Sequence, residues 1–245
     1  MDAITLYAIT VVILFVSTFT RSAIGFGDGV IAMPLLVIVM GVRTATPLVA
    51  LVACVLSVVI VYKNRISIDM EAVRPLVISS VVGIPIGLLM LKGLSEDLMK
   101  IILGCIIASY GLYGLVRPPL APVSNRKGIS LLCGFIAGIL GGAYNVNGLF
   151  VAMYGAMRRW PPQQFRATMH SYFLPTGFFI MIGHAISGLW TARVFGLFGF
   201  ALPWVLLAIY MGGKVNRRLA PGSFERYVHC FLMIVGIILV VRSAI

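Results

Sequence analysis

The chain has 245 residues, of which 60% are hydrophobic and only 11% are charged. Soluble globular domains carry about 25% charged residues, so this composition excludes an ordinary soluble protein. Apolar runs of about 20 residues, the length that crosses a bilayer, recur along the chain. No polar tract is long enough for a soluble domain. We therefore predict an all-α, polytopic membrane protein in which residues 1–245 form a single transmembrane domain.

The formal net charge of +12 raises the question of nucleic-acid binding. The basic residues, however, lie in short loops between apolar runs, as the positive-inside rule predicts, and not on one basic face. We expect a lipid bilayer as the surroundings, no nucleic-acid partner, and a multi-pass location in the inner (cytoplasmic) cell membrane. The loop residues are Lys63 and Arg65, Arg126 and Lys127, Arg158 and Arg159, and Arg217 and Arg218.

The four cysteines lie inside apolar runs without CxxC spacing, which indicates neither a disulfide framework nor a zinc site. No nucleotide-binding motif occurs, so we expect no cofactor and no metal. The first apolar run follows Asp2 instead of a basic segment and reaches Arg21 without a small-residue cleavage site. We expect it to be retained as the first span and not removed as a signal peptide.

Ten apolar segments follow one another in chain order. Those of the first half are residues 4–24, 29–41, 48–62, 75–91 and 98–116, and those of the second are 129–140, 148–157, 167–187, 194–211 and 227–241. Residues 43–47 are predicted to break the chain. Residues 117–127, RPPLAPVSNRK, contain prolines that a membrane-crossing helix does not tolerate. They form the predicted linker between repeat 1 (residues 1–116) and repeat 2 (residues 128–245).

A glycine-rich break interrupts the apolar sequence once in each half. The first break, IGFGDG, holds Asp28 between glycines, and an apolar run with Pro34 follows it to Gly41. The second break covers residues 141–147 and reads GGAYNVN. Breaks at corresponding positions of two halves are typical of the binding site of a transporter built from repeats.

Two short alignments between the halves indicate an internal duplication. They place Gly27 on Gly141 and Gly41 on Gly155 with a shift of 114 residues, and Gly83 on Ala208 and Gly87 on Gly212 with a shift of 125. Small residues permit close helix crossing, and we assign a set of glycines to packing and not to chemistry. These are Gly83, Gly87, Gly134, Gly138 and Gly212.

The loop charges predict how the halves are oriented. Five segments in each half, an odd number, invert the second half relative to the first. All four basic loops then lie inside and both termini outside, as the positive-inside rule requires. A parallel four-plus-four arrangement would place residues 214–226 outside. We therefore predict two inverted repeats of five segments each, with short, broken helical hairpins that meet near the membrane centre.

The paired blocks resemble the sulfite exporter TauE/SafE family of membrane transporters. The resemblance rests on the GxGxG motif, the apolar run with Pro34 and Gly41, the pair Gly83 and Gly87, and Gly212, and it covers essentially the whole chain. It implies an exporter of sulfite or small organosulfonates, such as those formed in the breakdown of taurine. The chain departs from the family's pattern at Asp28, where small residues or glycine are usual.

The breaks themselves suit an anion. Helix N-termini, expected here near Val30 and Gly148, present main-chain N–H groups that bind anions, and glycine lets the main chain approach the ligand. We expect substrate contacts from both breaks, with amide and hydroxyl donors in the second. The alternative is that these side chains only cap or pack the hairpins. The candidates are Gly25, Phe26, Gly27, Asp28 and Gly29, and Gly141, Gly142, Tyr144, Asn145 and Asn147.

Charged side chains add three further hypotheses. Asp28 is either the proton-coupling group, a salt-bridge partner of Arg21, or the cap of a helix that starts at Gly29. Arg21 and Arg166 are candidate cationic anchors, because a guanidinium binds oxyanions through two parallel donors. Their alternatives are snorkelling to the inner headgroups and positive-inside placement. His170 faces the cavity or binds a main-chain carbonyl.

Together these features predict a secondary transporter that exports a small sulfur oxyanion, sulfite or an organosulfonate such as sulfoacetate, by alternating access. We expect protons as the coupling ion, and a homo-oligomer is compatible with the sequence. The alternatives are an anion channel and a transporter of another small organic anion, such as a carboxylate. A membrane-embedded enzyme is less favoured, because Asp28 stands without the acid–base cluster that catalysis requires.

Overall fold

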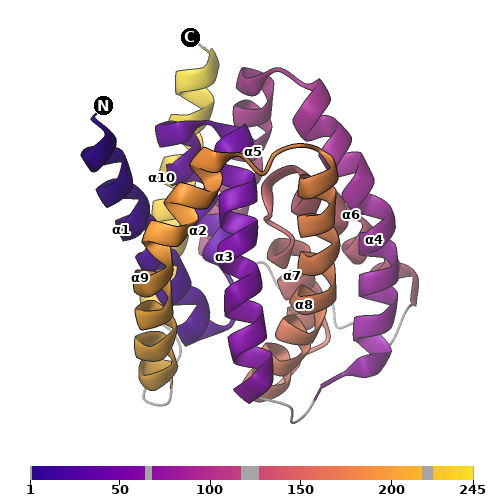
Figure 1. Cartoon of the computed structure of the whole chain (residues 1–245). Helices are drawn as coiled ribbons and strands as arrows, with labels where there is room; N and C mark the ends of the chain where they lie inside the picture. Colours follow the sequence, from indigo (N-terminus) through magenta and orange to yellow (C-terminus); the bar gives the residue numbers. More distant parts are fainter. Residues whose placement is uncertain (1, 64–67, 117–126, 217–222, 245) are drawn as a thin grey trace.

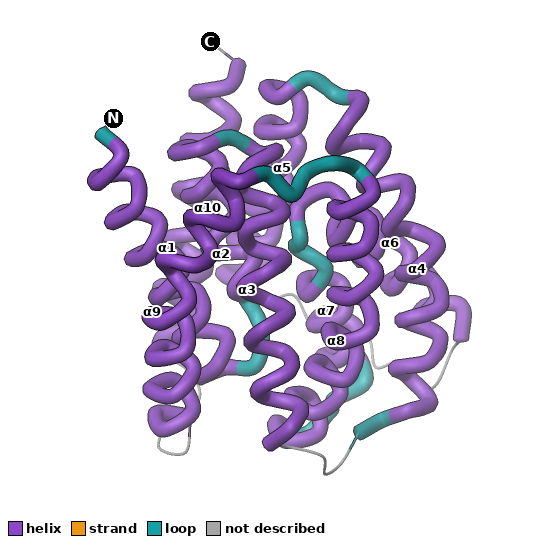
Figure 2. Tube along the Cα trace, in the orientation of Figure 1, coloured by secondary structure: helices purple, strands orange, loops and turns teal. Residues whose placement is uncertain are grey.

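The computed structural model describes residues 2–63, 68–116, 127–216 and 223–244. These residues form ten helices and no strand, which confirms the all-α prediction (Figures 1 and 2). The predicted linker lies outside the described residues except for Lys127, which opens a helix. The helices are α1 (Ala3–Ile24), α2 (Asp28–Met40), α3 (Val42–Lys63), α4 (Met70–Gly93), α5 (Glu96–Val116), α6 (Lys127–Tyr144), α7 (Gly148–Met157), α8 (Pro162–Ile186), α9 (Ala192–Asn216) and α10 (Ser223–Ala244).

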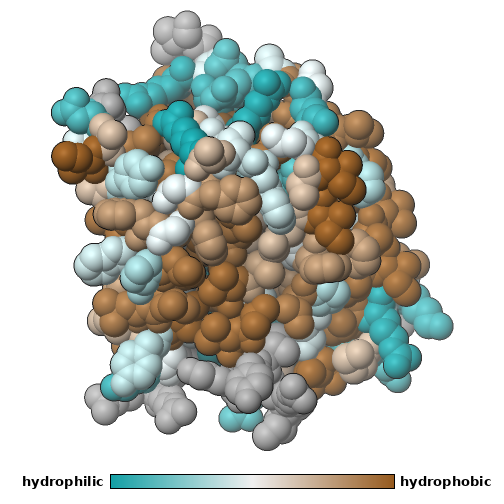
Figure 3. All heavy atoms as spheres, in the orientation of Figure 1, coloured by the Kyte–Doolittle hydropathy of each residue, from teal (hydrophilic) through white to brown (hydrophobic). Residues whose placement is uncertain are grey.

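Within the described residues, six helices are long and apolar enough to cross a membrane: α1, α3, α4, α5, α6 and α9. Helix α8 is equally long, but its Arg166 and His170 lower its hydropathy, and both side chains are at least partly buried. On the face shown in Figure 3, exposed apolar side chains cover the middle of the molecule, with hydrophilic residues above and below. This belt is the surface expected of a multi-pass membrane protein.

The two halves of the chain interlock through their helix pairs. Helix α4 packs along α6, α9 along α1, α5 along α10, and α3 against α8. The first helix of each half thus pairs with the fourth helix of the other half. Such reciprocal pairing is expected of two related halves, and the inverted repeat itself stays a prediction. Helix α1 begins and α10 ends at the same end of the bundle, at the top of Figure 1.

Glycine allows these long helices to touch. A methyl group on Gly87 would overlap the Ile139 carbonyl oxygen of α6, and one on Gly138 would overlap the Ser80 carbonyl of α4. In the α1–α9 pair, a methyl on Gly212 would lie only 2.6 Å from the Phe19 carbonyl oxygen. The assignment of these glycines to packing is therefore confirmed.

Both predicted breaks that follow are wrong in extent, and α4 and α8 begin at Met70 and Pro162, earlier than the predicted starts at residues 75 and 167. Residues 43–47 do not break the chain, because α3 begins at Val42 and only Gly41, with φ 81°, separates it from α2. Pro47 sits early in the helix, where a single main-chain hydrogen bond is lost, and the neighbouring Thr46 hydroxyl donates to the Val42 carbonyl at 2.9 Å.

The second break is also shorter than predicted. Helix α6 continues through Gly141 and Gly142 to Tyr144, so only residues 145–147 interrupt the helical sequence. As a result, α2 and α7 begin farther apart in the sequence than the 114-residue shift implies. The glycine-rich sequence suggests a longer break, but Gly141 and Gly142 allow close helix packing instead. A methyl on Gly142 would overlap the Ile84 carbonyl oxygen of α4.

Candidate anion-binding site

The two breaks meet in the interior of the bundle. Gly25 ends α1 and Gly27 precedes α2, with left-handed φ values of 109° and 105° that glycine adopts without steric cost. Asn145 in the other break is also left-handed, with φ 55°. A methyl group on Gly29 would overlap the Asn145 carbonyl oxygen. The two interruptions therefore contact each other directly, as the sequence predicts.

A buried ion pair joins α1 to the start of α2. Nη1 of Arg21 donates to Oδ2 of Asp28 at 2.6 Å, and Nη2 donates to the Ser57 hydroxyl at 2.7 Å. The guanidinium also lies 4.3 Å from the centroid of the Phe173 ring, within the range of a cation–π contact. Arg21 is only 2% exposed and Asp28 8% exposed. The ion pair therefore ties α1, α2, α3 and α8 together around the first break.

This geometry decides between the alternatives for both residues. Asp28 is the first residue of α2 and not its cap, because Gly27 occupies the N-cap position and no side chain caps the helix. The predicted cap is wrong, and the salt bridge to Arg21 is confirmed. Snorkelling of Arg21 to the headgroups is also wrong, because Asp28 and Ser57 satisfy the guanidinium in the interior.

Arg166 and His170 lie on neighbouring turns of α8 beside this pair. The Arg166 side chain packs over Gly25, and its Nη2 donates to the Ser22 carbonyl at 3.1 Å. His170 is only 3% exposed, and the guanidinium groups of Arg21 and Arg166 lie within electrostatic range of its ring. We call Arg21, Asp28, Arg166 and His170 the arginine cluster.

The arginine cluster retains unused hydrogen-bonding capacity. Among the described residues, Nε of Arg21 and both ring nitrogens of His170 are buried without a hydrogen-bond partner. The expectation that His170 binds a main-chain carbonyl is therefore wrong. Buried polar atoms without partners are costly and call for an explanation. Two guanidinium groups beside a single carboxylate also leave an excess positive charge, so an entering anion would supply both the missing charge and the missing acceptors.

Two side chains at the second break use their polar groups in hydrogen bonds within the protein. Tyr144 donates its hydroxyl to the Met99 carbonyl at 3.0 Å, and Nδ2 of Asn147 donates to the Thr176 hydroxyl at 3.3 Å. Gly141 packs against Asn147 and Ile180. These contacts hold α6 and α7 to α5 and α8. Their predicted contact with substrate stays a prediction.

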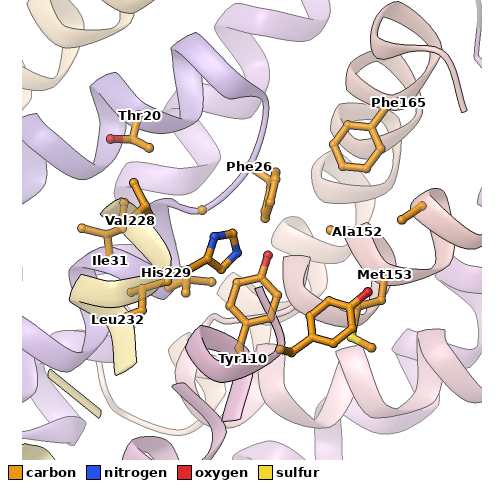
Figure 4. A pocket seen from close by; sticks show the side chains of 14 residues that line it. Thr20, Phe26, Ile31, Tyr110, Ala152, Met153, Phe165, Val228, His229 and Leu232 are labelled. Atoms are coloured by element: carbon orange, nitrogen blue, oxygen red, sulfur yellow. The ribbon is translucent and has the colours of Figure 1, made fainter. Parts of the chain in front are cut away.

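A cavity of about 230 Å³ lies beside the first break (Figure 4). Phe26, Gly27 and Val30 form one wall of the cavity. The opposite walls come from the ends of α5, α7 and α10 nearest the basic loops, with Tyr110, Met153 and His229 among the lining residues. Sequence reasoning missed these residues, because α5 and α10 resemble ordinary apolar spans and the pairing of α5 with α10 has no local signature.

The apolar belt and the interrupted helices are the features of a multi-pass membrane protein, and the arginine cluster lies in its interior. The chain matches the family described as sulfite exporter TauE/SafE over residues 9–239. The match covers nearly the whole chain, and the protein belongs to this family. No curated protein and no solved structure matches the chain. The family indicates a small anionic substrate carried across a membrane, which agrees with the resemblance noted from the glycine blocks.

Proposed function

We propose that this protein is a secondary transporter of the inner cell membrane that exports a small sulfur oxyanion, either sulfite or an organosulfonate such as sulfoacetate. The observation that carries the proposal is the arginine cluster at the meeting point of the two breaks. Arg21, Arg166 and His170 present cationic or unpartnered donors there, in a chain of the TauE/SafE family.

The chemistry of the ligand fits these donors. A sulfonate presents three acceptor oxygens around one sulfur, and guanidinium groups bind oxyanions through parallel N–H donors. The first turn of α2 adds main-chain N–H groups and the positive end of the helix dipole. The start of α2 contacts the second break at Asn145. In an alternating-access cycle, a displacement of one hairpin relative to the other would therefore reshape the site.

Asp28 provides a route to proton coupling. As a carboxylate it occupies one donor of Arg21 at 2.6 Å and opposes a second anion nearby. Protonation of Asp28 would neutralise it and release that donor for the substrate. Asp28→Asn should abolish the pH dependence of transport while leaving transport measurable. Unchanged pH dependence in this variant would exclude Asp28 as the coupling group.

The decisive experiment is transport by the purified full-length protein in proteoliposomes. Sulfite, sulfoacetate and thiosulfate would be compared with simple carboxylates as substrates, and as competitors in counterflow. We expect saturable counterflow of the sulfur oxyanions. Preferential transport of carboxylates would overturn the sulfur assignment. A current that does not saturate, with no counterflow, would identify a channel and overturn the carrier mechanism.

A further inference from the structure

We infer that the exported anion carries an apolar organic body, which occupies the cavity beside the first break. The preferred substrates are then alkyl- or arylsulfonates and not sulfite itself. This inference rests on the proposed function and specifies its substrate class. It follows from the lining, the position and the size of the cavity.

The lining is predominantly apolar. The hydrocarbon walls include Ile31, Met153 and Leu232, and the aromatic residues Phe26 and Tyr110 face the same space (Figure 4). Only Thr20, Tyr110, Tyr113 and His229 contribute side-chain polar atoms to the lining. A bare oxyanion gains little from the hydrocarbon walls, because they cannot replace its hydration. An alkyl chain or aromatic ring does gain, since burial of apolar surface is favourable and ligand pockets are mostly apolar with a few polar groups.

The cavity borders the arginine cluster, because Gly27 and Phe165 line the cavity and are the sequence neighbours of Asp28 and Arg166. Phe26 and Phe165 line the cavity and contact each other edge to face, with ring centroids 5.8 Å apart. Gly25, the residue before Phe26, packs against Arg166, the residue after Phe165. A ligand at the start of α2, where Gly27 also lines the cavity, would therefore direct its charged end to the cluster and its body into the cavity.

The size of the cavity agrees with this arrangement. A buried apolar cavity of about 150 Å³ is enough to bind benzene. The cavity here, at about 230 Å³, accommodates one aromatic ring or a short alkyl chain together with part of a headgroup. Sulfite alone would leave most of this volume without contacts. The dimensions thus favour an organosulfonate with a body of roughly four to seven carbon atoms.

The test is equilibrium binding of a sulfonate series to the purified full-length protein. Methanesulfonate, propanesulfonate, pentanesulfonate and benzenesulfonate share one headgroup and differ only in the apolar body. We expect the affinity to rise about fourfold for each added methylene. Sulfite or methanesulfonate binding as tightly as pentanesulfonate would overturn the inference and leave the proposed function intact. Pentanoate binding more tightly than pentanesulfonate would instead overturn the sulfur assignment.

Two variants of Met153 test whether the apolar body of the substrate occupies the cavity. Met153→Trp should fill part of it and weaken pentanesulfonate binding by about tenfold or more, with methanesulfonate changed by less than about threefold. Met153→Leu nearly conserves the volume and serves as the matched control. Equal loss for both ligands, or no loss for either, would place the body elsewhere and contradict the inference. The series on the unsubstituted protein decides the question even where Met153→Trp fails to fold.

Discussion

The carboxylate of Asp28 lies 2.6 Å from the guanidinium of Arg21 in the interior of the bundle. The two residues flank the first break, so the ion pair spans the interruption between α1 and α2. Two charges that are buried together stabilise each other, and either one alone is costly. The pair therefore fixes the shape of the break while keeping a guanidinium buried in the interior of the bundle.

Substitution of both partners of this ion pair should destabilise the protein by less than the two single substitutions add up to. Arg21→Gln or Asp28→Asn leaves one buried charge unpaired, at a cost of about 3–5 kcal/mol. The double variant removes both charges, so its loss should be smaller than the sum of the single losses. Unfolding of the four proteins in detergent measures this cycle. Additive losses would show that the ion pair is not energetically coupled.

The contact between the breaks makes Gly29 intolerant of any side chain. Gly29→Ala would force its methyl group into the Asn145 carbonyl and push the hairpins apart. We expect a loss of about 1–3 kcal/mol in stability, together with a loss of transport. Gly199→Ala is the matched control, since a methyl there has open space and alanine favours helix. Similar behaviour of the two variants would mean that the breaks do not need close approach.

Substitution of His170 distinguishes a structural role of this residue from a role in anion binding. Its ring nitrogens have no partner among the described residues, so His170→Phe removes no hydrogen bond. We expect the stability to change by less than about 1 kcal/mol, because an apolar replacement of similar shape is nearly neutral. Anion transport, in contrast, should fall. A stable variant with unchanged transport kinetics would remove His170 from the site.

The spacing of glycines and apolar runs in the sequence predicts the helical architecture more accurately than it predicts the contacts of the candidate site. Gly83, Gly87 and Gly212 fix helix pairs because a glycine spaced along an apolar helix has few roles besides close packing. The membrane class and the meeting of the breaks follow from composition and from the repeated glycine blocks. These features are local, or repeat within the sequence, and are therefore visible without coordinates.

The errors concern side chains whose partners are distant in the sequence. Arg21 and Asp28 are only seven residues apart, yet local rules favour snorkelling for one and capping for the other. Their burial depends on Ser57 and Phe173, which come from α3 and α8. The cavity has the same origin, since Tyr110 of α5 and His229 of α10 come together only through the pairing of those helices.

Asp69 forms another polar contact between the halves, near the basic loops. Asp69 accepts hydrogen bonds from Arg158 and Trp160, both at 3.1 Å, and its other oxygen caps α4 through the Ala72 N–H. Asp69→Asn keeps the cap but weakens the charged contact, and we expect a loss of about 1–2 kcal/mol. Asp69→Ala also removes the cap and should cost about 1 kcal/mol more. Melting temperatures that do not decline in this order would contradict the assignment.

The most direct test of the account is equilibrium binding of radiolabelled organosulfonate to the purified protein and to Arg166→Gln. Arg166 donates one hydrogen bond to the Ser22 carbonyl and lies beside the unpartnered donors of the arginine cluster. We predict a single saturable site whose affinity falls about tenfold or more in the variant, since a hydrogen bond to a charged group is lost. Saturable binding of equal affinity in both proteins would contradict it, because the anion would then bind away from the arginine cluster.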